Sequence, residues 1–328
     1  MMIMVNKLKL PIDLKRFYYN YICTCKFKTF MQFIIYILVY PFLWFISILP
    51  FRLLYAFSDF MYLLIYRVFG YRKKTVKDNL RLVFPEKDDK EINKITKKFY
   101  HHLCDMMVEA IKSLSISEAE MKERYVFTNV DLIQDLENQG RSMVLMLAHY
   151  GSWEWIFILQ TYVKSRGNAV YKRIENKYFD RLVKRIRAKY NSHLITTKET
   201  VPLLTKLKKE GITTVNGFIS DQTPKPWKAF HWTEFMKIRV PVHTGAEMLA
   251  KRLDMSVVFF SVKRLKRGYY EATFETLADH PNDFKDYEIT DKFLKLVENQ
   301  IHEAPEYYLW THKRWKHKDK SPEDYIKP

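Results

Sequence analysis

The sequence of 328 residues has little cysteine, glycine or proline. Its three cysteines, Cys23, Cys25 and Cys104, are too few for the disulfide framework of a small secreted protein, and no second pair completes a zinc site with Cys23-Thr24-Cys25. Only 8 Gly and 12 Pro, with 16% aromatic residues, exclude the composition of disordered or low-complexity chains. We therefore expect a folded protein with reduced thiols and room for a sizeable core.

Acidic residues are also in deficit, and this points to the kind of partner. Lys and Arg number 55 against 37 Asp and Glu, which gives a net charge of +18. Such an excess favours an anionic partner: nucleic acid, an acidic protein or anionic lipid headgroups. His101, His102, Cys104 and Asp105 are metal-ligand types, but neighbouring residues on a helix point in different directions, so we interpret them as a helix face and predict no metal site.

Charge is absent from Thr29 to Phe51, a run of about 23 residues that is long enough to cross a hydrocarbon core of roughly 30 Å. It begins too late and is too long for a cleaved signal peptide, and a buried core helix is the alternative. A second apolar stretch, Leu53 to Tyr66, is too short to span and is expected in the interface or against the anchor. Basic residues on both sides leave the orientation open, and they also suit a segment that enters the membrane and returns.

These patterns divide the chain into a basic N-terminal segment (1–28), a membrane anchor with an interfacial helix (29–70) and a charge-rich folded domain (71–328). In the last part, apolar runs typical of strands alternate with helical patterns. The alternation predicts an α/β domain with a mainly parallel sheet flanked by helices. Expected strands are 142–148, 169–172, 213–219, 256–262 and 269–274, and expected helices are 72–84, 90–114, 153–163, 178–190 and 245–251.

The stretch His149-Tyr150-Gly151-Ser152-Trp153-Glu154 directly follows the first of these strands. Ser152 suits a helix N-cap and Glu154 the first helical turn. Across such a strand-to-helix turn, Glu154 can reach back and hold the imidazole of His149, which then acts as a general base on a hydroxyl. The simpler interpretation is a hydrogen-bonded turn histidine and a helix-dipole glutamate.

Polar residues follow two further strands, and in open α/β sheets active residues gather at the carboxyl ends of strands. Lys172 and Arg173 follow the second strand, and Asp221 and Gln222 follow the third. These side chains and His149 are therefore expected to form one site.

Four blocks in this order resemble the lipid A biosynthesis acyltransferases, within the wider glycerolipid acyltransferase group marked by His-x4-Asp/Glu. The blocks are HYGSWE at 149–154, with Ser152 in place of the usual Asn; YKR at 171–173, with an inserted lysine; Asp-Gln at 221–222; and PEYYLWTHKRWK at 305–316. The resemblance covers nearly all of residues 29–317 and is similar to the Bacteroidetes-type version. After Gln222 the family's Gly-bearing stretch is missing, so the acyl or acceptor pocket is expected to differ.

The resemblance implies transfer of a fatty acyl group from an acyl carrier protein thioester, or acyl-CoA, to a hydroxyl of a lipid A precursor. His149 would be the base and Glu154 the carboxylate that fixes its tautomer. Substrate-binding roles are implied for Lys172, Arg173, Asp221, Gln222 and Arg314, with Arg173 either at the oxyanion or on a phosphate. No metal or other cofactor is implied. The expected partners are the carrier protein, the precursor and anionic lipids at the bacterial inner membrane, with the catalytic domain facing the cytoplasm.

Other interpretations remain at this stage: an O-acyltransferase acting on another lipid, such as a lysophospholipid or an amino-acid lipid, or a non-catalytic lipid-binding protein of the same fold. The basic stretch from Arg181 to Lys189 is either a solvated helix face or a contact for lipid or the carrier protein. Aromatic and basic residues alternate from Trp310 to Lys318, as in interfacial segments. Nucleic acid is not expected as a partner, because the chain has an apolar anchor and no recognised nucleic-acid fold.

Overall fold

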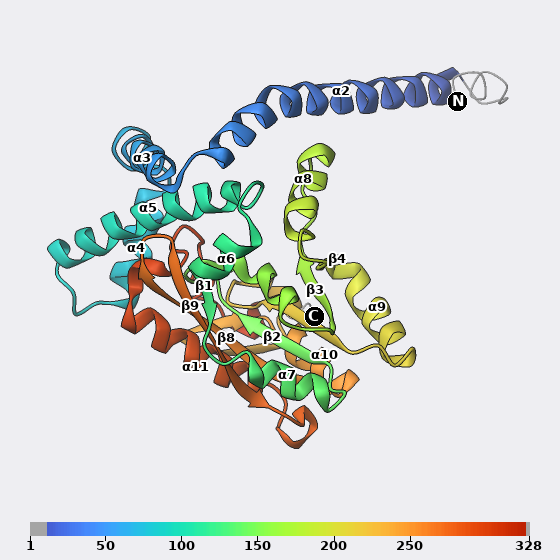
Figure 1. Ribbon diagram of the computed structural model, residues 1–328, viewed down its shortest axis with the longest axis vertical. Helices are drawn as coiled ribbons and strands as arrows, with labels where there is room; N and C mark the ends of the chain where they lie inside the picture. The colour runs from blue at the N-terminus through green and yellow to red at the C-terminus, as the bar shows by residue number, and fades with distance from the viewer. Residues whose placement is uncertain (1–11, 326–328) are drawn as a thin grey trace.

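A computed structural model describes the backbone of residues 12–325 and the side chains of residues 27–321, 323 and 324. Residues 1–11, in the expected basic segment, lie outside it. The chain forms one mixed α/β body with a long N-terminal helix that runs along one side of it (Figure 1). The expected fold class is thus confirmed.

The central sheet has seven strands in the order β1-β9-β8-β2-β5-β3-β4. All neighbours are parallel except β8 and β9, which form an antiparallel hairpin. A separate two-stranded hairpin joins β6 and β7. The strands are β1 (Tyr125–Phe127), β2 (Met143–Leu147), β3 (Arg166–Tyr171), β4 (His193–Thr196), β5 (Thr214–Ile219), β6 (His231–Phe235), β7 (Ile238–Val242), β8 (Ser256–Lys266) and β9 (Tyr269–Ala278).

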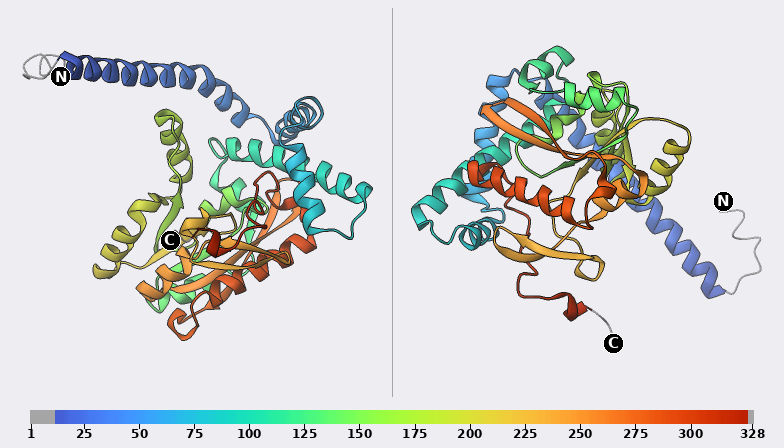
Figure 2. Two further views of the ribbon diagram at one scale, coloured as in Figure 1. Left: turned by 180° about the vertical axis from the view of Figure 1, so that it is seen from behind. Right: turned by 90° about the horizontal axis from the view of Figure 1, so that it is seen from below.

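Helices cover both faces of this sheet, as the two views of Figure 2 show. The α-helices are α2 (Ile12–Ile48), α3 (Phe51–Tyr62), α4 (Lys73–Val83), α5 (Asp89–Lys112), α6 (Glu118–Arg124), α7 (Asp131–Asn138), α8 (Lys177–Arg187), α9 (Thr197–Lys209), α10 (Gly245–Leu253) and α11 (Glu288–Glu303). A π-helical segment, η1 (Leu63–Val68), continues α3. The 3-10 segments are η2 (Trp153–Thr161), η3 (Pro226–Lys228), η4 (Pro281–Asp283), η5 (Pro305–Tyr307) and η6 (Pro322–Tyr325).

Strand β2 lies at the centre and is buried along its whole length. Because successive side chains of a strand point to opposite faces, it divides its residues between two apolar clusters. Val144 and Met146 pack with the cluster that contains residues of α4, α5, α10 and α11, whereas Met143, Leu145 and Leu147 pack with residues of α6, α7 and η2. Burial on both faces explains why this segment reads as a continuous apolar run.

Helix α2 carries the candidate membrane segment, Phe27–Ile48, of which only 11% is buried. This exposure argues against the alternative of a core helix. The second apolar stretch forms α3 and η1, which pack on α5, and η1 is followed by a bend of 85° into α4. Residues 51–68 and 73–83 are long and apolar enough to cross a membrane only if they are taken together as one bent segment.

Most expected elements are present with boundaries shifted by a few residues. Two expectations about the motif turn were wrong. Residues 153–161 form a 3-10 helix rather than an α-helix, and among the described side chains Ser152 makes no capping hydrogen bond. The sequence patterns also did not predict α6, α7, α9, α11, the short strands β1 and β4, or the β6–β7 hairpin.

Candidate active site

His149 lies just beyond the carboxyl end of β2, and Asp221 lies just beyond that of β5, the adjacent strand. The imidazole Nδ1 is 2.8 Å from Asp221 Oδ1. Asp221 is 1% exposed, so its carboxylate is shielded from water, while the His149 side chain keeps 20% of its surface accessible. An imidazole that is hydrogen-bonded to a buried carboxylate through one ring nitrogen and is accessible on its other side has the arrangement of a general base.

The electrostatics of the pair favour an ionised Asp221. Burial alone would raise the pKa of Asp221, but His149 and backbone N–H groups outweigh it and hold that pKa below its ordinary value. Burial likewise lowers the pKa of His149, and the Asp221 carboxylate outweighs this effect, so that the pKa of His149 is raised. Since an ionised carboxylate only accepts hydrogen bonds, Nδ1 of neutral His149 carries the proton and Nε2 keeps the lone pair.

The expectation that Glu154 holds the imidazole was wrong. In the described part of the chain, Glu154 forms an ion pair with Arg187 of α8, whose Nε is 3.0 Å from Glu154 Oε2. The Glu154 charge acts on His149 only through space, as the last of the influences that raise the pKa of His149. Asp221, for which the resemblance implied a substrate-binding role, takes the place beside the imidazole that the sequence suggested for Glu154.

Two further groups contact the imidazole. The Gln222 side-chain nitrogen lies 3.3 Å from both ring nitrogens, so the Asp-Gln pair as a whole faces His149. The Trp153 ring packs edge-on to the imidazole at a centroid distance of 5.2 Å.

The motif turn is fixed by the C-terminal block. Leu309 N–H donates to His149 O at 3.1 Å, and Gly151 N–H donates to Tyr307 O at 3.0 Å. Gly151 has φ of +60°, and an added Cβ would meet Val262 Cγ1 at 3.0 Å, so this turn requires glycine. Asn79 of α4 holds the same block from the other side by donating to Trp310 O and His312 O, each at 2.9 Å.

Arg314 is a structural part of the site rather than an open substrate contact. Its side chain is 1% exposed, and Nη1 donates to Thr223 Oγ1 and to Pro241 O, each at 3.1 Å. It thereby holds the loop that follows Gln222. Within the described residues, Nε and Nη2 of Arg314 have no hydrogen-bond partner, and the guanidinium lies close enough to Asp221 for the two charges to interact.

The interfacial interpretation of residues 310–318 was wrong for its largest side chains. Trp310 and Trp315 are 0% and 3% exposed and stack at 5.9 Å in the core beside β6. The interleaved aromatic and basic residues of this segment therefore support the site from the interior of the protein.

Lys172 and Arg173 follow β3, on the far side of β5 from β2, and both are exposed. Arg173 Nε is 3.9 Å from Asp180 of α8, with 73% of the Arg173 side chain accessible. The described contacts therefore join His149, Asp221 and Gln222 directly, whereas Lys172 and Arg173 stand at the same edge of the sheet without touching that group.

A cavity of about 180 Å³ lies beside the motif turn. One wall is a face of α5, with Leu103, Met106, Met107 and Ala110 at helical spacing, and the other walls are Leu309 and residues 152–154. Its lining is predominantly apolar, and Trp153 separates it from the imidazole. On the other side of Trp153 from His149 there is thus a predominantly apolar space.

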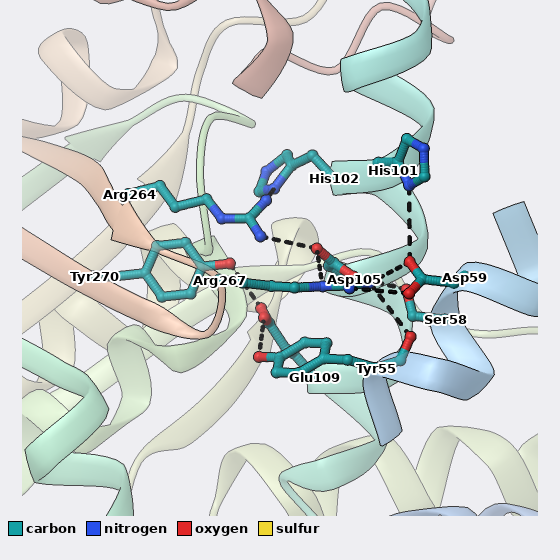
Figure 3. A network of polar contacts seen from close by, with 10 residues as sticks. All are labelled: Tyr55, Ser58, Asp59, His101, His102, Asp105, Glu109, Arg264, Arg267 and Tyr270. Atoms are coloured by element: carbon teal, nitrogen blue, oxygen red, sulfur yellow. Dashed lines mark hydrogen bonds and ion pairs between the residues drawn. The ribbon is translucent and has the colours of Figure 1, made fainter. Parts of the chain in front are cut away.

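Behind this cavity, a buried polar network ties α3 to α5 and to the β8–β9 hairpin (Figure 3). Asp105 accepts hydrogen bonds from Ser58 at 2.7 Å, from Arg264 at 2.8 Å and from Arg267. Glu109 accepts from two tyrosine hydroxyls, Tyr55 and Tyr270, each at 2.8 Å. The helix face expected around residues 101–105 is therefore a packed one.

Fold and site together define an α/β protein with an N-terminal apolar helix long enough to cross a membrane and a histidine hydrogen-bonded to a buried carboxylate at the carboxyl edge of its sheet. The family model described as bacterial lipid A biosynthesis acyltransferase matches residues 24–317. The protein belongs to this family and is an acyltransferase. It is similar to the lipid A biosynthesis lauroyltransferase of Escherichia coli (strain K12), with 25% identity over 256 residues, which cover 77% of this chain and 82% of that relative.

Proposed function

We propose that the protein transfers a fatty acyl group from an acyl carrier protein thioester to a hydroxyl of a lipid A precursor at the cytoplasmic face of the inner membrane. The observation that carries this proposal is the His149–Asp221 contact of 2.8 Å, with an apolar cavity on the other side of Trp153, in a chain of the lipid A acyltransferase family. The apolar helix α2 supports a membrane-bound acceptor.

In the proposed reaction, Nε2 of His149 removes the proton of the acceptor hydroxyl as its oxygen attacks the thioester carbonyl. The tetrahedral intermediate then expels the thiol sulfur, which takes the proton back from the imidazolium, and the products are an ester and the free thiol of the carrier. Asp221 stabilises the imidazolium throughout. No covalent acyl-enzyme and no further cofactor are needed, because a thiolate is already a good leaving group.

The substrates are assigned by chemistry. The acyl chain enters the cavity between α5 and the motif turn, and the carbonyl then lies near His149. Backbone N–H groups at the start of η2, or Arg173, stabilise the oxyanion. The basic residues of α8 and of the neighbouring loop meet the phosphates of the acceptor or the acidic carrier protein. Glu154 acts as a positioning residue, since its ion pair with Arg187 joins the motif turn to α8.

The test is an assay of purified protein with acyl carrier protein and acyl-CoA donors against lipid A precursors and lysophospholipids, with His149→Ala as the control. We expect acylated lipid A precursor from the wild type and none from the variant, which should remain folded and membrane-bound. Mass spectrometry of lipid A from a deletion strain should show one acyl chain fewer. An unchanged acyl count, or transfer only to lysophospholipid, would exclude the proposed acceptor, and no turnover of any donor would favour a lipid-binding protein.

A further inference from the structure

Helix α2 is long and apolar enough to cross a bilayer, yet its side chains are not distributed like those of a simple span. Between residues 29 and 48, every side chain with a hydroxyl or amide group lies on one stripe of the helix: Thr29, Gln32, Tyr36, Tyr40 and Ser47. Their spacing of three, four, four and seven residues keeps them on one face. All five are half-buried or buried.

The opposite side of α2 is apolar and open. The residues directly opposite the polar stripe recur at the same helical period, and each is at least 40% accessible: Met31, Ile35, Leu38, Phe42 and Phe45. Phe30, Ile37, Trp44 and Ile48, on the flank of this row, are exposed as well. Over residues 29–48 the helix is therefore two-sided: one face carries all the amide and hydroxyl groups, and the other carries only apolar side chains.

The polar stripe faces the catalytic domain and contacts it. Near its N-terminal end, Gln32 Nε2 donates to Glu175 O at 3.2 Å, and Asn176 Nδ2 donates to Gln32 O at 3.2 Å. One turn further on, Tyr36 stacks on Tyr178 at 5.7 Å. An ion pair between Lys28 and Glu175 adds to this contact.

A second contact holds the C-terminal end of α2, where Lys112 Nζ donates to Leu49 O at 2.9 Å and Ser115 donates to Ser47 O. Gln32 and Ser47 are 15 residues apart, which is roughly 22 Å along a helix. The domain thus lies along the side of α2 rather than at one end of it, and Figure 1 shows α8 reaching up beneath the helix.

This arrangement is incompatible with a helix that stands across the bilayer. A perpendicular α2 would carry the loop before α8 most of the way through the hydrocarbon core. That loop holds exposed charges at Lys172, Arg173 and Glu175 and irregular backbone, neither of which is tolerated facing lipid.

We propose that α2 lies in the plane of the bilayer interface, with its apolar face among the acyl chains and its polar stripe on the catalytic domain. Both ends of the helix then stay on the side of the membrane where the domain lies. The basic residues of α8, including Arg181 and Arg185, lie just below the helix and meet anionic headgroups. Basic residues on both flanks of the apolar run fit this arrangement, since neither end crosses.

The first test determines on which side of the membrane each end of the chain lies. The full-length protein carries one epitope tag at each terminus, and protease is added to inside-out and to right-side-out membrane vesicles. An in-plane helix places both tags on one side, so both are digested in the same vesicle orientation. Digestion of the two tags in opposite orientations would show a spanning helix and overturn the proposal. Neither outcome depends on the acyl-transfer reaction.

The second test probes the contact itself in native membranes. In a background with Cys23→Ser and Cys25→Ser, the pair Gln32→Cys and Asn176→Cys should form a disulfide under mild oxidation, because these residues are in direct contact. Cys104 is buried and can remain. In the matched control, Asn176→Cys is combined with Leu38→Cys. Leu38 is 72% exposed on the opposite face of α2, so these two cysteines should stay reduced. Absence of the first disulfide, or equal formation of both, would contradict the in-plane arrangement.

Discussion

Replacing Asp221 by Asn tests which carboxylate serves His149. The variant keeps the shape of the side chain but removes its charge. The Asn amide can donate to Nδ1, and this would hold the imidazole in the tautomer whose Nε2 is protonated and cannot accept the hydroxyl proton. The lost hydrogen bond, at 2.8 Å between buried groups, is charge-assisted and is worth about 1.5–3 kcal/mol. With the general-base contribution also lost, kcat should fall by about 10²–10⁴-fold.

The pH profile gives an independent measure. Because a base must be neutral, activity rises with pH through the pKa of His149, which Asp221 raises above its ordinary value. Without the Asp221 carboxylate, the effect of burial on the imidazole is opposed only by the weaker through-space effect of Glu154, so the pKa of His149 falls and the acidic limb of the residual activity should move to lower pH. The assay measures initial rates of acyl transfer from pH 5 to 9 at saturating donor, with circular dichroism to confirm folding.

Glu154→Gln is the matched control, since it removes a carboxylate from the same site at equal size. We expect the loss of the Arg187 ion pair to reduce activity less than Asp221→Asn does and to leave the acidic limb almost in place. If Glu154→Gln instead moved the limb and abolished turnover while Asp221→Asn behaved like the wild type, the pairing of His149 with Asp221 would be refuted.

Three further predictions follow from single positions. Ala110→Leu narrows the cavity beside the motif turn and should shift the donor preference to shorter acyl chains, each surplus methylene costing roughly 10–200-fold in kcat/KM; an unchanged chain-length profile in an active variant would place the acyl chain elsewhere. Gly151→Ala combines a φ of +60° with a contact of 3.0 Å to Val262, so it should lose about 1–3 kcal/mol of stability and lower kcat, and an unchanged Tm would count against the required turn. Burial raises the pKa of Glu109 to about 7, against an ordinary value of 4.5, so the unfolded chain loses its proton first and stability falls as pH rises from 4.5 to 7. Glu109→Gln should remove this loss, a relative gain of about 3 kcal/mol at pH 7, and equal pH dependence of the two proteins in denaturant titrations would contradict it.

Local patterns determined much of this protein. The sequence predicted the uncharged run of α2, the buried strand β2 and the polar residues that follow β2, β3 and β5. It could do so because periodicity and burial determine the order of polar and apolar residues along the chain. The same patterns predicted the mainly parallel sheet, since alternating strands and helices can pack in few other ways. His149 and the Asp221-Gln222 pair were also placed at strand ends by this reasoning.

Only the tertiary structure decided which groups meet. Glu154 is five residues from His149 in sequence, but the 3-10 geometry of η2 turns it toward Arg187 of α8. Asp221, 72 residues away, reaches the imidazole because β5 pairs with β2 in the sheet, and strand order is a non-local property. The burial of Arg314 and the contact of α2 with residues 175–178 also depend on which segments pack together. The residues next to them in sequence do not determine that packing.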